Sequence, residues 1–217
     1  MTDDEDDGRP ARARLLAAVV EHVAAHGLGD LSLRRLAAAL GTSHRMLIYH
    51  FGSKEGLLVA VVREVEERQR RALAELVDEV GEAGPAELVR RFWARLADPA
   101  LGPHERLFFE VYGRALQGDP GAAPLLDGVV DAWLGPATDA AVRLGVPPHE
   151  ARDGARLGLA VTRGLLLDLL ATGDRAAVDA AMGRFVAQLE ASVPAAGTAG
   201  GRRQPALRTR RAGRRPA

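Results

Sequence analysis

The segment LSLRRLAAALGTSHRMLIYHF, residues 31–51, decides the fold that we predict for this chain. Ser32 can cap a helix over residues 33–40, and Gly41 ends that helix. Thr42 or Ser43 can cap a second helix that runs to about residue 51. Two helices joined by a three- or four-residue turn containing glycine form a helix-turn-helix. This pattern predicts that the second helix enters the major groove of DNA.

The same segment, extended to Leu58, resembles the N-terminal domain of the TetR (tetracycline-repressor) family of homodimeric transcriptional regulators. The resemblance covers about residues 10–60 and rests on Leu36-Ala37, Gly41, Ser43, His50-Phe51, Lys54 and Leu57. It implies a repressor that binds a palindromic operator and is released by a small-molecule effector of unknown identity. Beyond residue 60, only the helical layout and the size are similar to the family.

One position departs from the family pattern. The family has tyrosine at the start of a Tyr-x-His-Phe run, where this chain has Ile48 and carries Tyr49 one step later. One residue turns a side chain by about 100° around a helix. The phosphate contact that the resemblance implies therefore cannot be assigned to Ile48, and Tyr49 either contacts another phosphate or points into the groove.

We predict a DNA-contacting surface built from the second helix and its flanks. Arg45 can pair with guanine through two hydrogen bonds, and Lys54 lies in the first turn of the next helix, where a phosphate is favoured. The predicted DNA-contacting residues are Ser32, Thr42, Ser43, His44, Arg45, Met46, Tyr49, His50 and Lys54. Arg34 and Arg35 either contact phosphates or form a solvated face.

Charge is segregated along the chain although the formal net charge is +0. Residues 1–8 carry five acids, which indicates an acidic disordered arm, and residues 9–53 form the basic DNA-binding domain. Residues 54–193 form an acidic effector-binding and dimerisation domain. Residues 194–217 hold seven arginines and no acid, which is typical of a disordered tail. This tail either adds DNA affinity, extends the chain neutrally or contacts the acidic N-terminal arm.

The fold class that we predict is all-α, with an N-terminal three-helix domain followed by a larger helical domain. A first helix is expected over residues 12–26, and Ser53 can cap a long helix. Glycine and proline punctuation sets the expected helices of the body at 54–80, 85–97, 103–117, 122–144 (kinked or split at Gly135-Pro136), 148–172 and 175–192.

The resemblance also implies a ligand pocket and a dimer interface in the body. The predicted ligand-binding residues are Phe92, Trp93, Phe108, Phe109, Tyr112, Trp133 and Arg163, with Arg106 and Glu110 as further polar candidates. Aromatic residues at helical spacing also suit an ordinary core. The acidic body leans toward neutral or cationic ligands. The last two helices, about 148–192, are expected to pair with those of a second copy, with Gly158, Ala160, Gly164 and Ala171 allowing close approach.

Several classes of protein and of functional site are not predicted. The chain has no cysteine, no run of about 20 apolar residues that could span a membrane, and an acidic start instead of a secretory signal, so a cytoplasmic location is expected. No hydrolase, zinc-protease or nucleotide-binding motif occurs, so we predict no enzyme and no cofactor. His22 and His26 lack a third ligand, so no metal site is predicted. The alternative is a helical DNA-binding protein without an effector.

Overall fold

A computed structural model describes residues 3–27 and 32–192, and within these ranges every regular element is a helix, as predicted. The α-helices are α1 (Asp3–His26), α2 (Leu33–Ala39), α3 (His44–Phe51), α4 (Lys54–Val80), α5 (Gly84–Leu96), α6 (Gly102–Leu116), α7 (Asp131–Arg143), α8 (Pro148–Thr172) and α9 (Arg175–Ser192). Short 3₁₀ turns lie at Gly81–Ala83, Pro99–Leu101 and Ala123–Leu126. The expected tail 194–217 lies outside the described residues.

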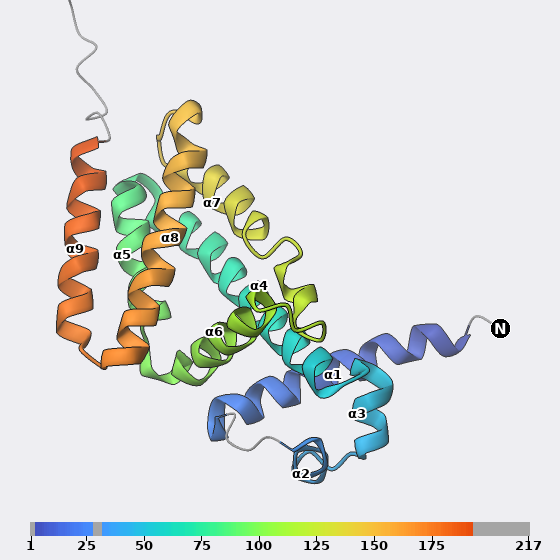
Figure 1. Cartoon of the computed structure of the whole chain (residues 1–217). Coiled ribbons are helices and arrows are strands. Elements are labelled where there is room, and N and C mark those ends of the chain that lie inside the picture. Colours follow the sequence, from blue (N-terminus) through green and yellow to red (C-terminus); the bar gives the residue numbers. More distant parts are fainter. Residues whose placement is uncertain (1–2, 28–31, 193–217) are drawn as a thin grey trace, which may run out of the picture.

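Helices α1, α2 and α3 form a small unit at one end of the molecule (Figure 1). The turn between α2 and α3 depends on Gly41, whose φ of +65° is in the left-handed region that favours glycine. The Ser43 hydroxyl accepts a hydrogen bond from the Met46 backbone N–H (3.1 Å), and the Ser53 hydroxyl accepts one from Gly56 (2.9 Å). These two caps fix where α3 and α4 begin.

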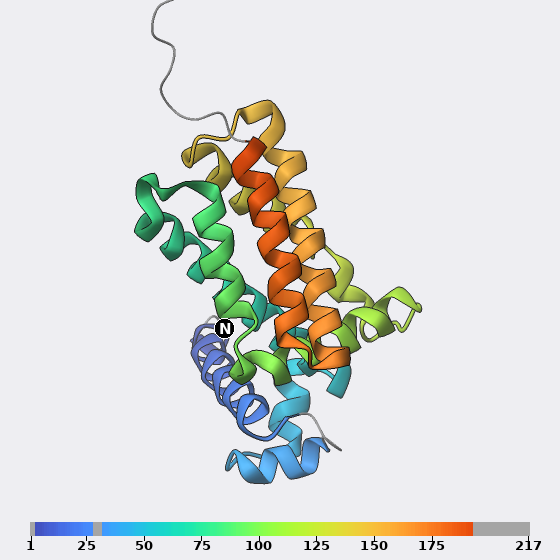
Figure 2. The same cartoon turned by 90° about the vertical axis from the view of Figure 1, so that its left-hand side faces the viewer.

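Helix α4 connects this unit to the body. Its first turns bury Leu57 and Leu58 against α1 and α3, whereas Leu73 and Val77 pack in a second core with Trp133. In the body, α8 and α9 lie side by side on one face (Figure 2), and α9 also packs on α5. None of the helices in residues 3–27 and 32–192 is long and apolar enough to cross a membrane.

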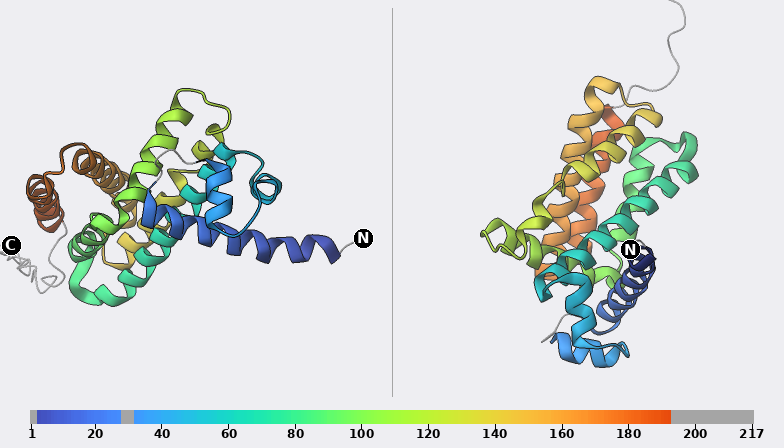
Figure 3. Two further views of the ribbon diagram at one scale, coloured as in Figure 1. Left: turned by 90° about the horizontal axis from the view of Figure 1, so that it is seen from below. Right: turned by 90° about the vertical axis from the view of Figure 1, so that its right-hand side faces the viewer.

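Two expectations about helix boundaries are wrong. Helix α1 begins at Asp3, so residues 3–8 are helical and not a disordered arm. An acidic run is compatible with the start of a helix, because the helix dipole is positive there. Figure 3 shows these first turns of α1 projecting beyond the rest of the molecule.

The second correction concerns the expected helix over 122–144. It is broken at residues 127–130, between a 3₁₀ turn and α7, and not at Gly135-Pro136, which α7 accommodates. Gly128 has a φ of +73°, which no helix residue can adopt, so the chain turns there.

Candidate nucleic-acid interface and buried cavity

Helix α3 presents one face to the core and the other to solvent. Leu47 and Phe51 are buried, while Tyr49 is 74% exposed and Met46 is 41% exposed. Arg45 and His44 are also exposed at the start of the helix. This two-sided pattern orients the helix, because the buried residues fix which side chains face outward.

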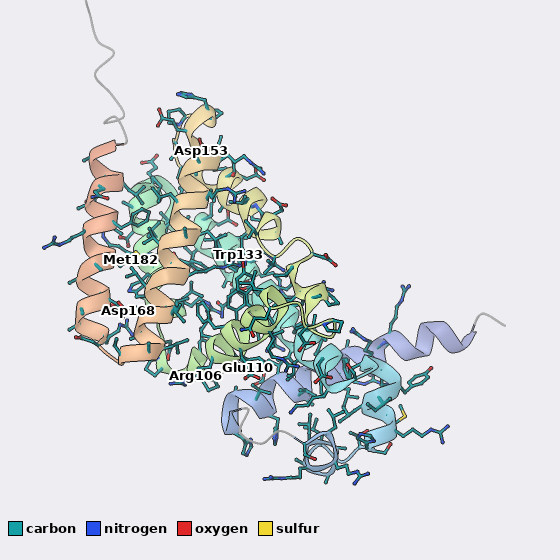
Figure 4. All side chains as sticks on the ribbon, in the orientation of Figure 1. Arg106, Glu110, Trp133, Asp153, Asp168 and Met182 are labelled. Carbon is teal, nitrogen blue, oxygen red and sulfur yellow. The ribbon has the colours of Figure 1, made fainter. Side chains whose placement is uncertain are left out.

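The other predicted DNA-contacting residues surround this face. Ser32 is exposed and precedes α2 without a side-chain cap bond, whereas the Ser43 hydroxyl is already engaged as the cap of α3. Thr42, His50 and Lys54 are half-buried. Figure 4 shows side chains of α2 and α3 extending outward at this end of the molecule.

The cations of this unit have no acidic partner among the residues that the structure describes. Arg34, Arg35, Arg45 and Lys54 form no ion pair there. The body differs, since ten of its fifteen arginines form ion pairs with carboxylates. The positive charge at the helix-turn-helix is therefore available to an external polyanion.

Arg12 has an internal role that sequence reasoning missed. Its Nε donates a hydrogen bond to the His50 carbonyl (3.3 Å), and its guanidinium lies 5.1 Å from the centre of the Phe51 ring. These contacts brace α1 against the end of α3. His22 and His26 on α1 stack with ring centroids 4.4 Å apart, an arrangement that needs no metal.

A cavity of about 360 Å³ lies inside the body, between α4, α5, α6, α7 and α8, with α9 closing one side. Five of the predicted ligand residues line it: Phe92, Phe108, Phe109, Trp133 and Arg163. Figure 4 shows Trp133 in the middle of the body. The volume is within the range of small-molecule sites.

Four polar or aromatic candidates lie elsewhere. Trp93 faces α9, where its Nε1 donates a hydrogen bond to Asp179 (2.7 Å). Tyr112 stacks on Phe108 at 5.3 Å outside the cavity lining. Arg106 and Glu110 are exposed at the outer side of α6 (Figure 4). Each was misplaced because sequence spacing alone did not say which side of its helix faces the cavity.

Six polar residues of the cavity wall were missed: Glu66, Gln69, His104, Glu105, Glu150 and Thr162. Glu66 and Gln69 share the apolar face of α4 with Val62, Val65 and Leu73. Polar side chains on an otherwise apolar stripe are a signal that could have identified them.

Glu66 is the most fully partnered of these groups. Its carboxylate accepts a hydrogen bond from Trp133 Nε1 (2.5 Å) and lies 3.6 Å from Arg163 and 3.9 Å from Arg70. Burial raises the pKa of Glu66, and these three partners oppose that rise.

His104 and Glu105 occupy adjacent positions in the first turn of α6. The buried His104 ring places Nε2 3.2 Å from the Val20 carbonyl of α1, and its Nδ1 has no partner among the described residues. Burial, followed by the charge of Glu66, raises the pKa of Glu105 to about 7, and Arg163 only partly offsets this. The cavity wall therefore touches α1 directly through α6.

The outer face of α8 carries exposed apolar and small residues. Leu157 (56% exposed) and Leu167 (52% exposed) lie on a stripe with Ala160, Gly164 and Ala171, at alternating spacings of three and four residues. A Cβ atom added to Gly164 would meet no atom within 4 Å. Gly158, expected on this face, lines the cavity instead, and Leu157 belongs both to the exposed surface and to the cavity lining.

Comparisons with known proteins agree with this geometry. The model of the family described as "Bacterial regulatory proteins, tetR family" matches residues 15–61, which run from α1 into α4. The HTH-type transcriptional regulatory protein RaaS of Mycobacterium tuberculosis is 44% identical over 64 residues. That match spans 30% of this chain and 30% of RaaS.

Two solved structures extend the likeness to the body. A TetR-family transcriptional regulator from Rhodococcus sp. is 21% identical, with a TM-score of 0.63 over 84% of this chain and 98% of that chain. A transcriptional regulator from Saccharomonospora viridis, solved in complex with choline, is 22% identical, with a TM-score of 0.56 over 83% and 95%. The fold is thus shared along nearly the whole described chain. The sequence likeness to the tetR family thus lies in the helix-turn-helix region, residues 15–61, and the body shares its fold with these solved structures.

Proposed function

We propose that this protein is a ligand-responsive transcriptional repressor that binds a palindromic DNA operator as a homodimer. The observation that carries the proposal is the outward face of α3. There Arg45, Met46 and Tyr49 are exposed on a helix held by a glycine turn, and Arg45 has no acidic partner among the described residues. Side chains of this kind can read base edges in the major groove.

The DNA contact can be tested by fluorescence anisotropy with DNA from upstream of the protein's own gene. We expect Arg45→Ala to lower the preference for the specific site by about 5- to 150-fold, equivalent to about 1–3 kcal/mol for a lost guanine contact. Arg106→Ala is the matched control, because Arg106 is an exposed, unpaired arginine in the body. Unchanged site preference in Arg45→Ala would contradict the assignment of α3 as the reading helix.

The proposed dimer uses α8 and α9. The outer face of α8 carries a stripe of small and apolar residues that lets a second helix approach closely: Leu157, Ala160, Gly164, Leu167 and Ala171. Because this stripe is apolar, its burial against a second copy of the chain is favourable. A two-fold arrangement would place the two α3 helices in successive major grooves, about one helical turn of DNA apart.

Light scattering coupled to size exclusion tests this interface. We expect Leu167→Asp to shift the protein from dimer to monomer, because the aspartate would be buried without a partner. Leu116→Asp serves as the control, since Leu116 is 64% exposed on α6, away from α8. A monomeric wild type at micromolar concentration would reject the dimer.

The proposed release of DNA passes through α6. This helix lines the cavity with Glu105 and Phe108, and it contacts α1 through His104. At its other end, Arg114 donates to Asp119 (2.6 Å) and reaches Glu55 at the start of α4 (3.5 Å). A ligand that favours another position of α6 would shift the population of DNA-binding conformations. If no ligand altered DNA binding, the alternative of an effector-free DNA-binding protein would hold.

A further inference from the structure

The charges inside the cavity are unequal. Three carboxylates line it, from Glu66, Glu105 and Glu150, whereas Arg163 is the single guanidinium in the lining. Arg163 is already committed, because it lies 3.6 Å from Glu66 and donates a hydrogen bond to the Val129 carbonyl (3.1 Å). The Glu66 carboxylate forms ion pairs with both Arg163 and Arg70. The pairing therefore leaves no cation for the second buried carboxylate.

Glu105 is that carboxylate. It lines the cavity at the start of α6, is half-buried, and forms no hydrogen bond or ion pair with any residue that the structure describes. A buried carboxylate without a partner is costly, because neither water nor protein compensates its charge. A site of this kind gains most from a ligand that supplies the missing positive charge.

The aromatic residues of the wall favour the same ligand class. Arg70 lies 5.6 Å from the centre of the Trp133 ring, and Arg163 lies 5.0 Å from that of Phe108, so two ring faces are already covered by protein cations. Phe92 and Phe109 line the same space, are partly exposed, and have no cation over their rings among the described residues. Ring faces attract organic cations, most strongly where water is excluded.

We infer that the cavity binds an organic monocation, an apolar amine or quaternary ammonium compound, with Glu105 as its counter-ion and Phe92 and Phe109 beside its charged group. This inference rests on the proposed function in one respect only, that the cavity is a ligand site. An anionic ligand of the same size is disfavoured, because it would enter a space in which carboxylates outnumber cations.

The protonation of Glu105 gives the site a pH dependence. The charges that act on it are those of Glu66 from α4 and Arg163 from α8, and His104 is its neighbour on α6, whereas Glu150 lines the cavity at the start of α8. Because the pKa of Glu105 is about 7, the carboxylate is mostly protonated at pH 6 and mostly ionised at pH 8. The affinity for a permanently charged cation should therefore rise about tenfold from pH 6 to pH 8.

The test is isothermal titration calorimetry on the full chain without DNA, with phenyltrimethylammonium, its neutral isostere tert-butylbenzene, and benzenesulfonate as an anion of similar size. We expect the wild type to bind the cation and not the anion. Glu105→Gln should weaken cation binding about tenfold or more, abolish its rise with pH, and leave tert-butylbenzene binding unchanged. Glu110→Gln is the matched control, because Glu110 is an exposed glutamate of the same helix outside the cavity lining.

Three results would overturn the inference: no cation binding by the wild type, tighter binding of the anion, or an equal effect of Glu105→Gln on the cation and its isostere. Thermal unfolding of each variant verifies that it is folded, and Phe92→Leu provides a second variant in which the cation should lose more affinity than the isostere. DNA binding is measured separately. A failed cation test with intact DNA binding rejects the ligand class, whereas lost DNA binding in the wild type rejects the proposed function.

Discussion

The helix-turn-helix unit and the body treat charge in opposite ways. In the described part of the helix-turn-helix unit, arginines and a lysine stand at the surface without acidic partners, whereas the body pairs most of its arginines and leaves a single carboxylate, Glu105, unpaired in its cavity. Charges that a fold could neutralise and does not neutralise indicate where a partner of opposite sign binds. Here they indicate a polyanion at one end and a cation within the other.

The largest expected effect is a difference in salt dependence between DNA binding at the helix-turn-helix unit and ligand binding in the body. Raising the salt concentration from 50 to 200 mM should weaken DNA binding by about 10³-fold or more, because phosphate contacts release condensed counterions. Binding of phenyltrimethylammonium in the buried cavity should change by less than about threefold, since ions screen enclosed charges poorly. Anisotropy and calorimetry over the same salt series check this. Equal salt dependence of the two equilibria would remove the contrast between the regions.

Glu66→Gln should produce the next largest effect, a loss of about 3 kcal/mol of unfolding free energy. The change leaves Arg163 and Arg70 without their buried carboxylate partner, although glutamine can still accept the hydrogen bond from Trp133. Urea unfolding gives the measurement. Glu75→Gln is the control, because Glu75 is an exposed glutamate of the same helix that forms no ion pair with the described residues. A fully stable Glu66→Gln protein would show that the body does not depend on this pairing.

Glu105→Gln should have the opposite effect on stability. In the absence of ligand at pH 8, we expect its free energy of unfolding to exceed that of the wild type by about 2 kcal/mol. In the folded protein Glu105 holds its proton up to about pH 7, compared with an ordinary value of 4.5, so the stability of the wild type falls as the pH rises between these values. The gain should therefore shrink toward pH 4.5. Thermal unfolding from pH 4.5 to pH 8 measures it, and a gain independent of pH would argue against ionisation of Glu105 as the cause.

Tyr49→Phe should give the smallest effect, a loss of DNA affinity of about two- to tenfold, which corresponds to one lost hydroxyl hydrogen bond. The side chain is largely exposed, so its removal should leave stability unchanged. Anisotropy with the specific operator checks this. If Tyr49→Phe binds as wild type, the neighbouring Ile48→Tyr variant, which restores the family pattern, distinguishes a lost contact from one that this chain never made.

Local sequence signals were sufficient for most of the helices and for the outward face of α3. Ser43, Ser53 and Gly41 each act through neighbouring backbone atoms, so their effect is visible in a short stretch of sequence. Helices α4, α8 and α9 begin and end where their caps and prolines predict. The start of α1 was missed because an acidic run is compatible both with a disordered arm and with a favourable helix N-terminus.

The residues that line the cavity could not be predicted from local sequence signals. Glu66 and Glu105 come together only because α4 and α6 pack against each other, and nothing in either stretch of sequence specifies that contact. Trp93 was misplaced for a related reason: its partner Asp179 is 86 residues away, on α9. Sequence predicted that the body holds aromatic residues, but tertiary packing decides which of them face the cavity.

Because α4 is one continuous helix, a tilt at the cavity moves its other end. Glu66 in the cavity wall and Lys54 at the DNA-facing end are twelve residues apart on one continuous helix, about 18 Å along its axis. A rod of that length that tilts by about 6° at the cavity moves its far end by roughly 2 Å. A tilt of α4 that is too small to open the cavity can thus move Lys54 by a distance comparable to the length of a hydrogen bond.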